Sequence, residues 1–90
     1  MAIVALKIKV MPESPETDLK IIKEQAEKSL IEEGAKRVII EEQDIAFGLK
    51  AIIVTIAWPE EKNTDIAENK LKEITGVSST EIIDYRRAIG

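Results

Sequence analysis

The order of hydrophobic patterns in this 90-residue chain predicts an α+β fold, the ferredoxin-like sandwich, with a four-stranded antiparallel sheet and two helices on one face. Four segments have the alternation or β-branched content of strands, and two have the spacing of amphipathic helices. Their order is βαββαβ. Each βαβ half requires a right-handed crossover, and two interleaved halves form one such sheet. The length fits a single domain over residues 1–90.

The first strand and the first helix are predicted from the N-terminal third of the chain. Apolar residues alternate with charged or small ones over residues 4–10, which is typical of a strand with one buried face. Two prolines within residues 11–15 then end the strand and form a stiff turn. Ser14 or Thr17 is the expected helix cap, and Gly34 ends the helix. The apolar stripe of this helix consists of Leu19, Ile22, Ala26 and Leu30.

Two strands are predicted in the middle of the chain. Residues 37–42 form a strand with three β-branched residues at its centre, and residues 43–46 form a connection. Phe47-Gly48 opens the longest strand, which continues to Trp58. Pro59 closes this strand because proline cannot donate a hydrogen bond to a sheet.

A second helix and a last strand complete the chain. Asn63 or Thr64 caps the helix, and Gly76 ends it. Residues 77–87 form the last strand. The apolar side of the helix consists of Ile66, Ala67, Leu71 and Ile74.

Composition excludes several classes of function. The chain has no cysteine and no histidine, so it has neither thiol chemistry nor the commonest general base and metal ligand. Thirteen basic and seventeen acidic residues give a net charge of −4, which provides no general attraction to nucleic acid or to an anionic membrane. No signal-peptide pattern or membrane-spanning run is found, so the expected location is the cytoplasm. We do not expect an enzyme.

The predicted fold hosts many unrelated functions, so the function must come from particular residues. An RNA-recognition module needs stacking aromatic residues in its central strands, whereas residues 49–54 are aliphatic or lysine. An acyl-phosphate hydrolase needs an arginine-lined loop after the first strand, whereas residues 11–14 contain an acidic residue and a proline. A small regulatory domain that dimerises and binds an amino acid stays open as an alternative.

Paired carboxylates are the remaining acid–base option. The adjacent pairs are Glu32-Glu33, Glu41-Glu42 and Glu60-Glu61. All lie at the ends of elements or in loops, where nothing indicates the burial that raises a carboxyl pKa. We interpret them as solvated surface charge.

Two features point to a partner protein. Phe47, the only phenylalanine, stands beside Gly48 at the start of a strand and next to a turn, and it either packs at the rim of the core or anchors a partner. Arg86 and Arg87 are two of the three arginines and lie near the C-terminal end of an acidic chain. They are either solvated charges or a mobile cationic end suited to an anionic pocket of a partner.

Four segments in register resemble archaeal elongation factor 1-beta: residues 10–15, 45–49, 76–77 and 84–87. The resemblance extends over the whole chain. It implies a guanine-nucleotide exchange factor for elongation factor 1-alpha, the GTPase that delivers aminoacyl-tRNA. The nucleotide belongs to that partner, so the chain needs no cofactor, no metal site and no direct contact with nucleic acid. A one-to-one complex is expected, and the oligomeric state of the free chain stays open.

The resemblance also implies site residues. Phe47 corresponds to an aromatic residue of the eukaryotic family that lies at the interface with the GTPase, and Gly48 keeps its place beside it. Arg87 falls opposite a near-terminal lysine that enters the magnesium and phosphate region of the GTPase. Arg86 is the adjacent candidate, and residues 88–90 extend the chain beyond this point.

Overall fold

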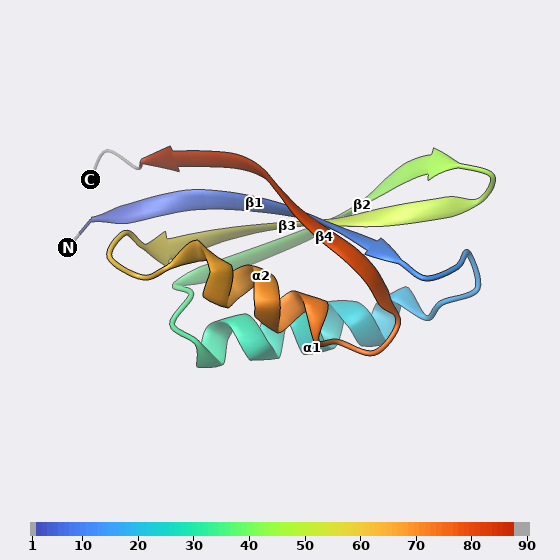
Figure 1. Ribbon diagram of the computed structural model, residues 1–90, viewed down its shortest axis with the longest axis horizontal. Coiled ribbons are helices and arrows are strands. Elements are labelled where there is room, and N and C mark those ends of the chain that lie inside the picture. Colours follow the sequence, from blue (N-terminus) through green and yellow to red (C-terminus); the bar gives the residue numbers. More distant parts are fainter. Residues whose placement is uncertain (1, 88–90) are drawn as a thin grey trace.

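The computed structural model describes residues 2–87 and has the predicted βαββαβ order (Figure 1). Its elements are β1 (Ile3–Pro12), α1 (Leu19–Glu32), β2 (Arg37–Ala46), β3 (Leu49–Pro59), α2 (Thr64–Lys72) and β4 (Val77–Arg87). The strands form one antiparallel sheet in the order β2-β3-β1-β4. The predicted ferredoxin-like fold is confirmed. Residues 88–90, which the sequence places after Arg87, lie outside the described residues, as does Met1.

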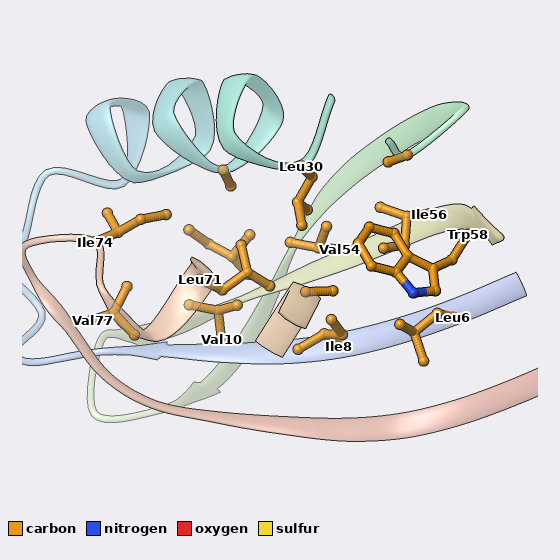
Figure 2. Packing of buried hydrophobic residues seen from close by; sticks show 14 of the residues in the cluster. Leu6, Ile8, Val10, Leu30, Val54, Ile56, Trp58, Leu71, Ile74 and Val77 are labelled. Carbon is orange, nitrogen blue, oxygen red and sulfur yellow. The ribbon is translucent and has the colours of Figure 1, made fainter. Parts of the chain in front are cut away.

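The core lies between the sheet and the two helices, both of which lie on one side of the sheet in Figure 1. Every second residue of β1 faces this core, and Figure 2 shows these side chains meeting those of β3 and the helices. Trp58 is fully buried, and its indole Nε1 donates a hydrogen bond to the Lys62 carbonyl oxygen at 3.1 Å. The largest fully buried side chains are Trp58, Leu6, Ile8, Ile22, Leu30, Ile52, Ile56 and Leu71.

The opposite face of the sheet is not covered by either helix (Figure 1). Small and half-exposed apolar residues form a shallow hollow there, with Ile3, Ala5, Ile39 and Ala57 in its wall. The core cluster therefore lies on the helix side of the sheet, and the buried Ala51 and Ile53 of β3 are not part of it. Within residues 2–87, no helix has the length and apolar content that crossing a membrane requires.

The first strand is longer than predicted, because it continues through Pro12. Its pairing with β3 ends where Val10 stands opposite Ile52, whereas its pairing with β4 continues until Pro12 stands opposite Val77. A proline is tolerated at a position that pairs on one side only. The prediction that residues 11–15 form only a turn is therefore wrong for the first two of them.

The cap of α1 also differs from the prediction. Asp18 is the N-cap, and its carboxylate accepts hydrogen bonds from the backbone N–H groups of Lys20 at 3.0 Å and Ile21 at 3.4 Å. Ser14 and Thr17 instead build the preceding turn, in which the Ser14 N–H donates to Thr17 Oγ1 at 3.1 Å. All three residue types cap helices well, so sequence alone does not separate them.

One of the two expected caps of α2 is confirmed, whereas the helix ends at Lys72, earlier than the predicted end at Gly76. Asn63 is the N-cap, and its side-chain oxygen accepts a hydrogen bond from the Asp65 N–H at 2.8 Å. The last strand has the predicted bounds, Val77–Arg87. Gly76 connects the two elements with a φ of 96°, which glycine adopts readily.

The second strand extends beyond its predicted end. Gln43 and Asp44 stand opposite Ala51 and Lys50 of β3, so residues 43–46 belong to β2 rather than to a connection. β2 is an edge strand, and its residues from Glu41 to Ala46 are exposed. Polar residues are tolerated in such an exposed edge strand, and for this reason the hydrophobic pattern does not reveal the strand there.

Two neighbouring residues of α1 test the placement of the core. Leu30 is completely buried, whereas Ile31 is 54% exposed. Leu30→Ala should lower the free energy of unfolding by about 2–5 kcal/mol, because it leaves a cavity in the core. Ile31→Ala, the matched control, should change it by less than about 0.5 kcal/mol. Urea unfolding followed by circular dichroism measures both, and equal losses would contradict this packing.

Candidate partner-binding site

Phe47 and Gly48 form the tip of the hairpin that joins β2 to β3. Both have positive φ angles, 53° and 78°, as the two central residues of a type I′ hairpin turn require. The prediction that they open the long strand is therefore wrong, since β3 begins at Leu49. A type I′ turn favours asparagine and glycine because their backbones enter the left-handed region easily. A phenylalanine in this position is unusual.

The aromatic ring of Phe47 does not pack against the rest of the chain. The residue is fully exposed, at 101% of its reference area, so packing at the rim of the core is ruled out. The left-handed backbone of a residue with a side chain costs about 1–2 kcal/mol, and no buried contact of the ring offsets this. Neither turn geometry nor packing within residues 2–87 explains the choice of phenylalanine, and the exposed ring is available to contact another molecule.

Gly48 has a different role from that of a close-packed glycine. A Cβ atom built on it would meet nothing within 4 Å, so space is not what requires glycine. Its φ of 78° is what favours glycine there. The residue therefore sets the shape of the turn and thereby the direction in which Phe47 points.

The base of the hairpin is tied to α1 by a small group of charges. The Glu42 carboxylate of β2 pairs with Lys23 of α1 and, at 3.7 Å, with Lys50 of β3. The hydrogen bond from Lys23 is the main reason that the pKa of Glu42 is lowered from its ordinary value. Exposed pairs of this kind contribute little stability.

Arg86 and Arg87 belong to the sheet. They stand opposite Ala5 and Val4 in the pairing of β4 with β1, so the prediction of a mobile cationic end is wrong for these two residues. Their side chains are largely exposed. Arg86 pairs with Asp84 on the same strand, with Nε 3.1 Å from a carboxylate oxygen. Arg87 pairs with the carboxylate of Glu60, which follows β3.

The structure places the two groups of predicted site residues at opposite ends of the sheet. The hairpin tip adjoins Leu49 at one end of β3, and Arg87 lies beyond Val4, which pairs with Trp58 at the other end. Leu49 and Trp58 are nine residues apart on one strand, or about 30 Å at the usual rise. Figure 1 shows the hairpin and the end of β4 on opposite sides of the molecule. A partner that contacts both must extend along the sheet.

Sequence analysis missed the acidic partners of the two arginines. Glu60 was interpreted as solvated charge, and it lies 27 residues before Arg87. No local pattern links the two residues. Only the strand order shows that the loop after β3 and the end of β4 meet beside the start of β1. Within residues 2–87, no group of three or more acidic residues is arranged to hold a metal ion.

Comparison with known proteins gives a family match over nearly the whole chain. Residues 5–88 match the EF-1 guanine nucleotide exchange domain, a range that includes Phe47, Gly48, Arg86 and Arg87. Elongation factor 1-beta of Methanosarcina barkeri is 46% identical, over 97% of this chain and 99% of its own length. The proteins of the same name from Methanothermobacter thermautotrophicus and Natronomonas pharaonis are 42% and 41% identical, each over 97% of this chain. They are covered over 98% and 99% of their own lengths.

The strained turn predicts an unusual response to mutation. Phe47→Asn should leave the free energy of unfolding unchanged or raise it by up to about 1 kcal/mol, because asparagine tolerates the left-handed backbone. Gly48→Ala, the control, should lower it by about 1 kcal/mol, since its φ angle strains any side chain. Thermal and urea unfolding measure both values. A clear loss of stability in Phe47→Asn would mean that the ring packs in solution.

Proposed function

We propose that this chain, which belongs to the family of EF-1 guanine nucleotide exchange domains, promotes the release of GDP and the loading of GTP on elongation factor 1-alpha. The family match confirms the resemblance that four short motifs predicted. The single structural observation that supports the proposal is the fully exposed Phe47 on a strained turn. A factor of translation elongation works in the cytoplasm, and we assign the chain to that location.

Phe47 supplies an anchor for the GTPase. A phenylalanine buries on the order of 150–250 Å² when it is covered, and aromatic residues are frequent among the few that dominate binding energy. The tight turn fixes the backbone from which the ring projects, so little backbone entropy is lost on association.

Arg87 supplies a cation to the region of the GTPase that holds magnesium and phosphate. Magnesium demands near-ideal octahedral geometry, so a small displacement of its ligands weakens its binding. A guanidinium placed among these ligands competes with the metal and offers a fork of donors to phosphate oxygens. Arg86 stands beside Arg87 and adds positive charge to the same end.

Exchange by this route makes and breaks no covalent bond. The factor weakens GDP binding, and thermodynamic linkage requires GDP to weaken factor binding by the same ratio. Rebinding of nucleotide therefore releases the factor, which can act on the next GTPase. The chain is catalytic in turnover without being an enzyme in the usual sense.

Arg87→Ala should slow the release of GDP by at least about tenfold, which corresponds to about 1.4 kcal/mol. The measurement loads elongation factor 1-alpha with a fluorescent GDP analogue, adds excess unlabelled nucleotide and follows the loss of fluorescence. Arg86→Ala is the matched control and should slow release less. Because the side chain of Arg87 is exposed, the variant should stay folded. An unchanged rate would remove Arg87 from the mechanism.

Phe47→Asn should raise the concentration of factor that gives half-maximal acceleration, because an anchor for the partner is lost while the hairpin is kept. The maximal rate should change less, since the cation at the other end of the sheet is intact. The same fluorescence assay over a range of factor concentrations measures both quantities. An unchanged concentration dependence would show that the ring is not in the interface.

A further inference from the structure

We propose that Glu60 is a positioning residue: it holds the Arg87 guanidinium in the free protein, yields it to the phosphate and magnesium region of the GTPase, and takes it back as the factor leaves. The inference rests on the proposed function of Arg87. It assigns a role to a carboxylate that the exchange mechanism otherwise does not use.

Glu60 is the fixed member of this ion pair. It follows Pro59, and its backbone N–H donates a hydrogen bond to the Ala2 carbonyl oxygen at 3.0 Å. A turn closes behind it, with the Lys62 N–H 3.1 Å from the Pro59 carbonyl oxygen. The side chain of Glu60 is 25% exposed, whereas that of Arg87 is 72% exposed. The Glu60 side chain is therefore the more enclosed member of the pair, and the Arg87 side chain is the one with room to move.

The pair is exclusive among the described residues. Within residues 2–87, Glu60 has no other ion pair, and neither has Arg87. Lys62, the cation nearest to Glu60 in the chain, is engaged elsewhere. Its Nζ lies 3.7 Å from a Glu33 carboxylate oxygen and 5.2 Å from the centre of the Trp58 ring. Within residues 2–87, no other cation is paired with Glu60 that could replace Arg87 when the arginine leaves.

Arg86 is held differently. Its partner Asp84 lies on the same strand, two residues away, so this pair moves as one unit with β4. The Glu60–Arg87 pair instead joins two elements that are 27 residues apart. The second pair therefore links the end of β4 to the segment that follows β3, which the first does not.

The exchange of partners follows from the donors of the guanidinium. Arginine has five N–H donors, so its fork can begin to contact a phosphate while a carboxylate still accepts from the other side. An exposed ion pair is weak and easily opened. While it accepts from the guanidinium, the carboxylate competes with the phosphate oxygens for Arg87. Glu60 therefore weakens the complex and speeds the departure of the factor.

Glu60→Gln tests this, because it removes the charge and keeps the shape and a hydrogen-bond acceptor. In the fluorescent-GDP assay, it should lower the GTPase concentration for half-maximal rate about 3–10-fold, a typical size for one charge contact. It should also lower the maximal turnover, because departure becomes slower. Glu60→Asp, which keeps the charge, should behave like the parent.

Two controls separate this role from a structural one. Glu61→Gln removes the same charge from the next, exposed position, which has no ion pair within residues 2–87, and should leave both parameters unchanged. In an Arg87→Ala background, Glu60→Gln should have no effect, since the pair is already broken. Urea unfolding of each variant verifies that it is folded.

The outcomes also distinguish this inference from the proposed function. If Arg87→Ala slows exchange and Glu60→Gln behaves like the parent, the role of Glu60 is overturned and that of Arg87 stands. An equal effect of Glu60→Gln with and without Arg87 overturns the role as well. If Arg87→Ala does not slow exchange, both the proposed role of Arg87 and this inference fail.

Discussion

The pairing of β1 with β3 on one side and β4 on the other is the constraint on which the rest of the structure depends. It places Leu6 and Ile8 of β1 in the core, between the sheet and the helices. A slip by one residue would turn these side chains to the uncovered face, so the register is strongly specified. In the same register, Val4 of β1 lies between Trp58 of β3 and Arg87 of β4. The pairing of β1 with β3 ends at Ile52, and the β2–β3 hairpin extends beyond that point.

The register also determines where the exposed residues at the two ends of the sheet lie. Phe47 and Arg87 contribute nothing to the buried core: the first lies in the turn between β2 and β3, and the second at the end of β4. The sheet thus separates by about 30 Å the two side chains that the proposed function assigns to contact with the GTPase. Because neither side chain belongs to the core, substitutions there should test the proposed binding without unfolding the chain.

The hydrophobic period was enough to predict the order of elements and the fold, because the core side of each element is nearly continuous. The hydrophobic period does not predict structure at exposed positions, where burial places no demand on the type of residue. The polar residues Gln43 and Asp44 at the exposed end of β2 predict a connection, and Ser14 and Thr17 predict the cap that Asp18 provides. Phe47 was placed in a strand because aromatic residues favour strands, and the left-handed turn that it occupies leaves no pattern beyond the following Gly48.

The candidate site was predictable in part. The single phenylalanine and the adjacent arginines stand out in this composition, and the family resemblance assigns their roles to Phe47 and Arg87. Their separation required the sheet order, and so did the pair between Glu60 and Arg87. Contacts between residues distant in the chain depend on the strand order, so they cannot be predicted from local sequence patterns alone.

The central claim is that one molecule presents both ends of its sheet to the same GTPase. The direct test compares the parent with an equimolar mixture of the Phe47→Ala and Arg87→Ala variants, at small molar fractions of elongation factor 1-alpha loaded with fluorescent GDP. The account predicts rapid release with the parent, and with the mixture no more than the sum of the two separate variants. A mixture that restores the parent rate would contradict the claim that one chain must bridge both contacts. No acceleration by the parent would contradict the exchange function itself.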